Sequence, residues 1–278
     1  MSKVPCITLN NGVEMPQLGF GVWQVPDTEA AKAVATAIEC GYRSIDTAAI
    51  YENEEGTGRA IAAAGVAREE LFVTTKLWNA DQGYDSTLRA FDTSLDKLGL
   101  DYVDLYLIHW PVPAKDAYIE TYKAFEKICS DGRAKAIGVS NFLPEHLERL
   151  LGETSVVPVI NQIELHPQLQ QAESRAFHAK HGIATEAWSP LGQGKGLLEV
   201  PTVVAIAQKH GRTPAQVVLR WHIQTGNVVI PKSVTPSRIV ENLDVFGFEL
   251  DADDLAAFAA LDEGKRLGPN PGEFNLGA

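Results

Sequence analysis

Four side chains that can hold or move protons are spaced so that one rim of a parallel sheet would bring them together. Asp46, Lys76 and His109 each end a predicted strand, and Tyr51 lies in the loop after the first of these strands. In an α/β barrel, functional residues come from the carboxyl ends of the strands and from the loops that follow them. Each residue alone is more often a surface charge, a structural histidine or a packing tyrosine. Their positions at adjacent strand ends favour an active site.

The chemistry that suits this set is proton donation to an oxygen. A tyrosine has an ordinary pKa near 10 and is a poor donor at neutral pH. We expect the Lys76 ammonium to favour the phenolate of Tyr51 and to lower its pKa, and Asp46 to pair with Lys76. His109 would donate a hydrogen bond to a substrate carbonyl. These roles fit the protonation of an oxyanion that forms when a hydride attacks a carbonyl carbon. The arrangement includes no metal-ligand spacing and no serine or cysteine nucleophile paired with a base.

A site for a nicotinamide is predicted after the later strands. Ser140, Asn141 and Gln162 are neutral hydrogen-bonding residues that suit a carboxamide, and Trp188 offers a flat face for stacking. Ordinary loop chemistry is the alternative for each of them. A hydride donor at this position would complete the reaction inferred from the four ionisable residues.

A phosphate site is predicted in the last strand–helix unit. Lys232 and Arg238 flank the start of a predicted helix, where cations and backbone N–H groups suit an anion. Barrels often bind phosphate in the loops after strands seven and eight. The two cations favour the 2′-phosphate of NADP over NAD, and simple surface cations are the alternative.

The elements that must position these residues alternate along the chain. A total of 278 residues fits one (β/α)8 barrel, whose usual size is about 250 residues. Eight strands are predicted, over residues 18–21, 44–46, 71–76, 103–109, 134–139, 159–163, 183–187 and 228–230. Gly19-Phe20-Gly21 lacks the third glycine of a dinucleotide-binding fingerprint, which argues against an open Rossmann sheet. The predicted fold is α/β, a (β/α)8 TIM barrel.

Helices are predicted between these strands from apolar periodicity and from terminal residues. The first is expected to have Thr28 as its N-cap and to end at Gly41. A capping box with proline at the first helical position begins at Thr213. The others are expected near 54–64, 88–98, 116–129, 144 onward, 171–180, 236–243 and 252–260. Residues 6–16 alternate around Asn10-Asn11-Gly12 and predict a hairpin before the barrel.

Composition excludes several classes of protein. The chain is 45% hydrophobic and 22% charged, and no apolar run approaches the roughly 20 residues that span a bilayer. Residues 1–5 lack a signal-peptide pattern, and three widely spaced cysteines indicate a reducing, cytoplasmic location. A net charge of -12 argues against nucleic acid and membrane partners. Nothing in the sequence demands an assembly, so a monomer is expected.

Five motifs give the chain a resemblance to the aldo-keto reductases, including the bacterial 2,5-diketo-D-gluconic acid reductases. They are residues 41–48 (GYRSIDTA), 105–111 (LYLIHWP), 138–142 (GVSNF), 161–167 (NQIELHP) and 230–233 (IPKS). The resemblance implies one barrel over residues 1–278, with residues 6–16 as a hairpin plug and NADPH/NADP+ as cofactor. It implies the catalytic tetrad Asp46, Tyr51, Lys76 and His109, with Tyr51 as general acid. The cofactor contacts that it implies are Gly21, Val22, Trp23, Asp46, Ser140, Asn141, Gln162, Trp188, Ser189, Leu191, Lys232, Ser233, Val234, Arg238, Glu241 and Asn242. Some relatives carry an additional basic residue where this chain has Thr235.

The substrate is expected to be a small-molecule carbonyl compound in a mainly apolar cleft. The predicted wall consists of Trp23, Tyr51, Trp78, His109 and Trp110, which suits aldehydes, α-dicarbonyls and keto-sugars. The loop at residues 265–278 is rich in Gly and Pro and is expected to set specificity. Two alternatives stay open: a hydrolase or isomerase on the same barrel, and a nucleotide-sensing protein that binds NADPH with negligible turnover.

Overall fold

Short apolar runs that are buried on both faces form the central sheet of the computed structural model, which describes residues 4–278. Residues 1–3, part of the segment without a signal-peptide pattern, lie outside the described residues. Neighbouring strands of the sheet are all parallel and follow one another in chain order. The strands are β3 (Phe20–Gly21), β4 (Ser44–Asp46), β5 (Phe72–Leu77), β6 (Val103–Ile108), β7 (Ala134–Ser140), β8 (Ile160–Glu164), β9 (Ala184–Trp188) and β10 (Val228–Val229).

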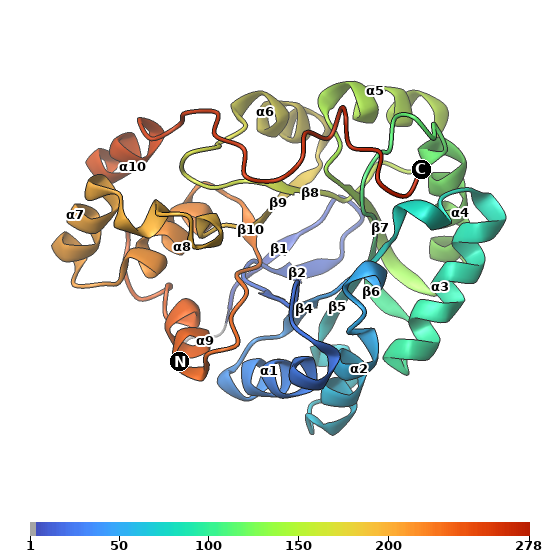
Figure 1. Ribbon diagram of the computed structural model, residues 1–278, viewed down its shortest axis with the longest axis horizontal. Coiled ribbons are helices and arrows are strands. Elements are labelled where there is room, and N and C mark those ends of the chain that lie inside the picture. The colour runs from blue at the N-terminus through green and yellow to red at the C-terminus, as the bar shows by residue number, and fades with distance from the viewer. Residues whose placement is uncertain (1–3) are drawn as a thin grey trace.

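The two ends of the sheet meet and close it. Leu18, just before β3, forms a parallel bridge with Val229 of β10. The backbone N–H of Gly19 donates to the carbonyl of Val229 at 2.9 Å, and that of Gly21 donates to Pro231 at 3.2 Å. Helices surround the closed sheet (Figure 1). The predicted (β/α)8 barrel is therefore confirmed, with strand bounds within two residues of those expected.

The helices cover the outer face of the sheet. They are α1 (Asp27–Cys40), α2 (Glu54–Ala63), α3 (Tyr84–Leu98), α4 (Tyr118–Ser130), α5 (Pro144–Glu153), α6 (Ala172–His181), α7 (Pro201–His210), α8 (Pro214–Gln224), α9 (Pro236–Leu243) and α10 (Ala252–Ala259). Short 3₁₀ turns lie at Ala49–Tyr51, Arg68–Glu70, Asn79–Asp81, Gly192–Gly194 and Leu197–Glu199. The capping box at Thr213 and the left-handed Gly41 after α1 are confirmed.

One helix prediction needs correction, and one helix was missed. Thr28 is not the N-cap of α1, because that position belongs to Pro26 and Thr28 lies exposed inside the first turn. Helix α7 was not predicted. Its β-branched residues favour strands over helices, but Val203, Ile206 and Ala207 share one face that is buried against the core. Tertiary burial outweighs the weak local propensity there.

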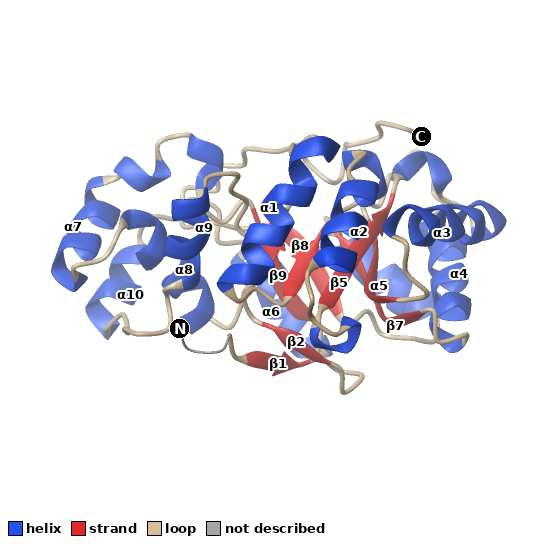
Figure 2. Cartoon of the chain, turned by 90° about the horizontal axis from the view of Figure 1, so that it is seen from below, coloured by secondary structure: helices blue, strands red, loops and turns tan. Residues whose placement is uncertain are grey.

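The hairpin closes the end of the barrel where the strands begin. Strands β1 (Cys6–Thr8) and β2 (Glu14–Pro16) pair antiparallel, and Gly12 in the turn has a φ of +85°. Leu9 and Met15 are buried in one cluster with Phe72 and Leu105 from the barrel strands. Figure 2 shows β1 and β2 at the lower end of the barrel and the C-terminus at the upper end. The upper end, where the strands finish, is the open one.

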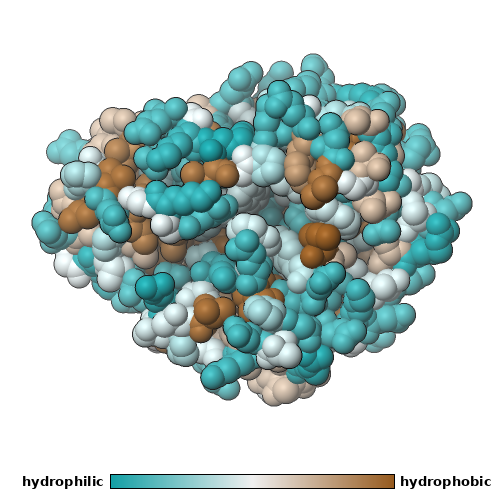
Figure 3. Space-filling view, viewed as in Figure 1, coloured by the Kyte–Doolittle hydropathy of each residue, from teal (hydrophilic) through white to brown (hydrophobic). Residues whose placement is uncertain are grey.

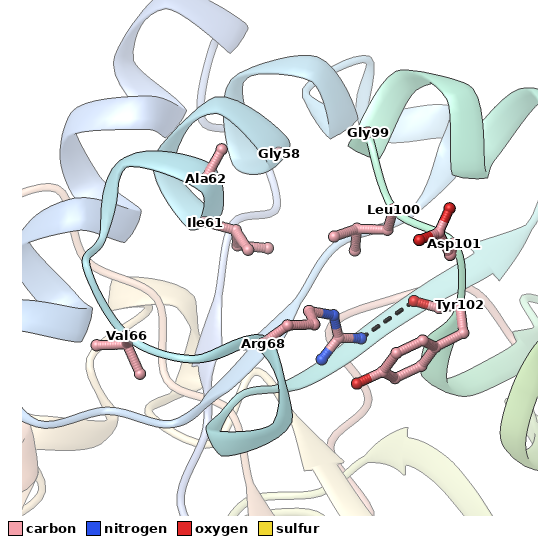
Figure 4. Close-up of a pocket in the computed structure, with 9 residues that line it drawn as sticks. All are labelled: Gly58, Ile61, Ala62, Val66, Arg68, Gly99, Leu100, Asp101 and Tyr102. Atoms are coloured by element: carbon pink, nitrogen blue, oxygen red, sulfur yellow. Dashed lines mark hydrogen bonds between the residues drawn. The ribbon is translucent and has the colours of Figure 1, made fainter.

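A groove on the outside of the barrel lies between α2 and the loop that enters β6 (Figure 4). Its walls include Ile61 and Ala62 on one side and Leu100 and Tyr102 on the other, with Arg68 donating to the Tyr102 carbonyl at 3.1 Å. Residues 99–102 precede β6, so the groove lies toward the closed end of the barrel. It is separate from the strand ends that carry the ionisable residues.

Two glycine-to-alanine changes in helices should alter stability in opposite directions. In Gly58→Ala, the new Cβ on α2 would collide with the Leu98 carbonyl, which should lower the free energy of unfolding by about 1–3 kcal/mol. In Gly152→Ala, the Cβ on α5 meets no heavy atom within 4 Å, and a gain of about 0.5–1 kcal/mol is expected. Thermal unfolding of both variants measures this, and equal shifts in one direction would contradict the close approach of α2 and α3.

Candidate active site

A fully buried ammonium lies at the open end of the barrel. Lys76, in β5, has no exposed side-chain surface, and its Nζ donates to Asp46 Oδ1 at 2.5 Å. The same nitrogen donates to the Thr47 carbonyl at 2.9 Å and to the Tyr51 hydroxyl at 3.4 Å. Burial is the largest single influence and opposes the charge, but Asp46, Tyr51 and Glu186 together outweigh it and raise the pKa of Lys76 above its ordinary value. Lys76 is therefore a charged, fully hydrogen-bonded group beside a phenol.

Tyr51 lies in the 3₁₀ turn after β4, with its side chain half-buried at the mouth of the barrel. Burial raises the pKa of Tyr51 above its ordinary value of 10.0, although Lys76 acts in the opposite direction. Lys76 acts on this phenol in the expected direction and lowers its pKa, but desolvation outweighs that effect, so the pKa of Tyr51 in the free protein is raised. The phenol stays protonated at neutral pH, and Lys76 is placed to stabilise the phenolate that remains after a proton leaves.

His109 directly follows β6 and faces the same space. Its ring centroid lies 5.6 Å from that of Tyr51 and 5.5 Å from that of Trp78. Burial, reinforced by the charge of Lys76, holds the pKa of His109 well below its ordinary value of 6.5. The buried Nδ1 has no hydrogen-bond partner among the described residues. A neutral imidazole can orient a carbonyl by hydrogen bonding without giving up a full proton.

The polar residues predicted for a carboxamide lie at the end of β7 and within β8, and Trp188 is the last residue of β9. Gln162 Nε2 donates to Asp46 Oδ2 at 2.9 Å and to a carboxyl oxygen of Glu186 at 2.8 Å. Because both amide hydrogens are used, the Gln162 carbonyl oxygen is the group left to accept from a ligand. Trp188 Nε1 donates to Asn141 Oδ1 at 2.8 Å, and Asn141 Nδ2 donates to the His109 carbonyl at 2.9 Å. This donor and acceptor set fits a planar amide between Gln162 and the tryptophan.

Glu186 was not predicted as a site residue, although it accepts a hydrogen bond from Gln162 in this network. It belongs to β9, is fully buried and shares the Gln162 amide with Asp46. Burial, together with the nearby Asp46 carboxylate, raises the pKa of Glu186 to about 8. A glutamate inside a strand gives no sequence signal for such a role, since only the barrel brings β4 and β9 together.

The predicted phosphate site lies at the start of α9. Lys232 and Arg238 are both exposed, and neither forms an ion pair with another residue in the described range 4–278. Ser233 Oγ accepts the N–H of Thr235 at 3.1 Å, which shapes the turn before the helix. The Glu241 carboxylate accepts from Thr213 at 2.8 Å. Two free cations beside a helix N-terminus suit a phosphate monoester.

The other residues predicted for the cofactor follow the neighbouring strand ends. Val22 donates its backbone N–H to the Asp46 carbonyl at 3.1 Å, and Ser189 has a φ of +51° in the loop after β9. The remaining members of the predicted set are Gly21, Leu191, Val234 and Asn242, of which Gly21 and Asn242 are buried and Val234 is exposed.

Aromatic side chains wall the cleft, and one comes from the C-terminal segment. Trp23 is 44% exposed at the rim, Trp78 is partly exposed, and the ring centroids of Trp110 and Phe274 lie 4.4 Å apart. The open face is hollowed near its centre (Figure 3). Phe274 was not predicted as a wall residue, because the docking of an irregular tail carries no periodic signal. Its contact supports the expectation that this segment borders the substrate.

Residues 4–278 contain no group of three or more His, Cys, Asp or Glu side chains arranged to hold a metal ion. Within the same residues, no helix has the length and apolar character needed to cross a membrane.

Removing the buried Glu186 carboxyl should stabilise the fold in a pH-dependent way. The unfolded chain ionises this group above its ordinary pKa of 4.5, whereas the folded protein keeps the proton up to about pH 8. The carboxyl therefore lowers stability progressively as pH rises between these values. The thermal midpoint of Glu186→Gln minus that of the wild-type protein should be larger at about pH 8 than at about pH 5. Exposed Glu148→Gln controls for the loss of a carboxyl, and a difference independent of pH would contradict the raised pKa.

Comparisons with known proteins agree with this geometry. Residues 16–263 match the model of the Aldo/keto reductase family. An aldo-keto reductase of Mycolicibacterium smegmatis is 61% identical over 98% of both chains, and methylglyoxal reductase DkgA of Escherichia coli is 56% identical over 99% of both. The crystal structure of an aldo/keto reductase from Brucella melitensis has a TM-score of 0.91 and 62% identity, covering 94% of this chain and all of that one. A mutant of Gox0644 in complex with NADPH has a TM-score of 0.94 and 52% identity, covering 98% and 99% of the two chains. The chain belongs to the aldo/keto reductase family.

Proposed function

We propose that this protein is an NADPH-dependent carbonyl reductase, an oxidoreductase that forms alcohols and that can oxidise a CH–OH group with NADP+ as acceptor. The observation that carries the proposal is the buried Lys76 ammonium, bonded to both Asp46 and the Tyr51 hydroxyl at the mouth of an aromatic cleft. This set serves proton donation to an oxygen, and both oxygens of its one carboxylate, Asp46, are held by Lys76 and Gln162.

Tyr51 is the proposed general acid. The carbonyl oxygen of the substrate accepts a hydrogen bond from the neutral His109 and faces the Tyr51 hydroxyl. NADPH, when bound, supplies the hydride that adds to the carbonyl carbon. As negative charge develops on the oxygen, Tyr51 transfers its proton there, and an alcohol is formed. An alkoxide is far more basic than a phenolate, so the raised pKa of Tyr51 does not prevent the transfer.

Lys76 and Asp46 prepare this step electrostatically. The phenolate left on Tyr51 lies 3.4 Å from the ammonium, which stabilises the new negative charge without reorganisation. Asp46 holds the ammonium in place through the 2.5 Å ion pair. The Gln162 amide donates to the Asp46 carboxylate and to the neutral carboxyl group of Glu186, and these two hydrogen bonds orient its carbonyl oxygen toward the carboxamide of the cofactor.

The cofactor assignment rests on the donor set at the strand ends. Ser140, Asn141 and Gln162 would hold the carboxamide, and Trp188 would stack on the ring. Lys232 and Arg238 would bind the 2′-phosphate and so would favour NADPH over NADH. The NADPH complex of Gox0644, at 52% identity, supports this choice.

Small aldehydes, α-dicarbonyls and keto-sugars such as 2,5-diketo-D-gluconate are the proposed substrates. Aromatic walls favour compact carbonyl compounds, and the methylglyoxal reductase name of a relative at 56% identity supports an α-dicarbonyl. Arg266, the half-buried cation of the C-terminal segment, faces Glu164 at 3.8 Å. An anionic sugar acid would therefore have to compete with Glu164 for this charge.

We further propose that the chain acts as one catalytic unit, a monomer in the cytoplasm with no nucleic acid partner. All groups in the proposed mechanism come from one chain, and the net charge of -12 disfavours polyanions.

Replacing the phenol should abolish reduction but leave nucleotide binding intact. In Tyr51→Phe, kcat for methylglyoxal should fall by about 10²–10⁴-fold, since general acid catalysis contributes effects of that size. The dissociation constant for NADPH, measured by fluorescence, should be unchanged. If Tyr51→Phe reduced methylglyoxal as fast as the wild-type protein does, Tyr51 would not be the general acid. Wild-type protein that binds NADPH without turnover would favour a nucleotide sensor, and nicotinamide-independent turnover would favour a hydrolase or isomerase.

The preference for the 2′-phosphate should depend on Arg238. Loss of a charge-assisted hydrogen bond in Arg238→Ala should raise KM for NADPH by about 10–100-fold and leave KM for NADH nearly unchanged. Arg89→Ala, at an exposed position on α3, is the matched control. An equal rise in KM for both nucleotides would contradict a contact with the 2′-phosphate.

A further inference from the structure

A buried carboxylate at the end of β8 holds the C-terminal segment and is not used in the proposed chemistry. Glu164 is fully buried, and Oε1 accepts the backbone N–H of Leu267 at 2.6 Å. Oε2 accepts the backbone N–H of Gly268 at 2.9 Å. Each carboxylate oxygen thus takes one amide of the same short stretch, which fixes the path of the chain there.

The surroundings favour the charged form of this carboxylate. His166 Nε2 lies 3.1 Å from Oε1, and the Arg266 guanidinium lies 3.8 Å from Oε2. Burial opposes the charge, but the hydrogen bonds from His166 and from the two amides outweigh it and hold the pKa of Glu164 below its ordinary value. Hydrogen bonds to an ionised acceptor are the stronger kind, so the contact is a firm anchor.

The anchored backbone packs directly against the tryptophan of the predicted nicotinamide site. A Cβ added at Gly268 would lie 2.6 Å from Cη2 of Trp188 and 3.2 Å from the Glu164 carboxylate. Only a residue without a side chain lets the backbone approach this closely. Trp188 in turn donates to Asn141, whose amide donates to the His109 carbonyl. Gly268, which Glu164 holds in place, therefore contacts Trp188, the side chain that would stack on the nicotinamide ring.

The far end of the segment reaches the substrate side of the cleft. Phe274 packs on Trp110, Asn79 donates to the Leu276 carbonyl at 2.8 Å, and Ala114 donates its N–H to Asn275 at 2.8 Å. In Figure 1 the segment, in red, crosses the open face from α10 to the side of α4. Its two ends are thus tied to the cofactor wall and to the aromatic wall.

We propose that Glu164 is a positioning residue for the cleft: by holding the amides of Leu267 and Gly268, it sets the C-terminal segment and the Trp188 indole in one arrangement. Substrate affinity then depends on a carboxylate that touches neither substrate nor cofactor. The kinetic part of this proposal rests on the function proposed above, whereas the anchor itself does not.

Two oxygens that both accept are essential to this role. In Glu164→Gln, one oxygen can still accept an amide N–H, but the new NH₂ group faces the other N–H donor. The hydrogen bond from that backbone N–H to the carboxylate is lost, and two N–H donors then face each other. Gly268→Ala tests the same contact from the other side, because it leaves the carboxylate in place and displaces the backbone from Trp188.

Hydrogen–deuterium exchange without cofactor tests the anchor directly. The amides of Leu267 and Gly268 should exchange about tenfold faster in Glu164→Gln than in wild type, as expected for the loss of one charge-assisted hydrogen bond. Exposed Glu273→Gln removes a carboxylate from the same segment and should exchange as wild type does. Unchanged exchange in Glu164→Gln would overturn the anchor.

Steady-state kinetics with methylglyoxal and NADPH test the positioning role. Glu164→Gln and Gly268→Ala should each raise KM for methylglyoxal about tenfold while kcat is largely retained, and Glu273→Gln should not. A lower kcat with unchanged KM would indicate general destabilisation and would overturn the proposal, as would unchanged kinetics with faster exchange. If Glu164→Gln does not fold, Gly268→Ala decides. Should wild-type protein reduce no carbonyl, the proposed function fails, and the exchange experiment still decides the anchor.

Discussion

One buried ion pair, between Lys76 and Asp46, organises the open end of this barrel. A fully buried ammonium without a partner would lower the stability of the fold by several kcal/mol, so Lys76 requires its hydrogen-bond partners. Because β4 and β5 are adjacent and parallel, the two side chains meet without distortion. Asp46 uses its second oxygen for Gln162, and Lys76 uses its remaining donors for Thr47 and Tyr51. The proposed acid and the proposed carboxamide site are thus parts of a single network.

The rest of the molecule keeps this network buried on one side and open on the other. The hairpin fills the end where the strands begin, with Leu9 and Met15 packed against the first residues of the barrel strands. At the opposite end, irregular backbone forms the rim, and the C-terminal segment brings Phe274 onto Trp110. Two buried carboxyl groups connect separate parts of this rim. Glu186 meets Asp46 through Gln162, and Glu164 meets the C-terminal segment through two amides.

Much of the barrel could be predicted from the sequence, because buried parallel strands read as short apolar runs and turns carry Gly, Pro and Asn. The strand at Ser44–Asp46 was predicted with its observed bounds, and the meeting of Asp46, Tyr51, Lys76 and His109 followed from their positions at strand ends. What failed depends on tertiary burial. The pKa of Tyr51 is set by desolvation, which no local pattern reveals. Glu186 and Glu164 are acids inside strands, and only the closed sheet and the docked tail show what they contact.

The central claim is that the Lys76 ammonium acts electrostatically on a protonated Tyr51 phenol. Tyrosine labelled with ¹³C at Cζ allows the Tyr51 signal to be titrated by NMR, with Tyr51→Phe for assignment and Lys76→Met for comparison. We predict that the phenol of the wild-type protein titrates above its ordinary value of 10.0. Loss of the ammonium in Lys76→Met should move this pKa further upward, because burial and the Asp46 and Glu186 carboxyls then act without an opposing positive charge. A Tyr51 pKa below the ordinary value, or one that Lys76→Met leaves unchanged, would contradict the claim.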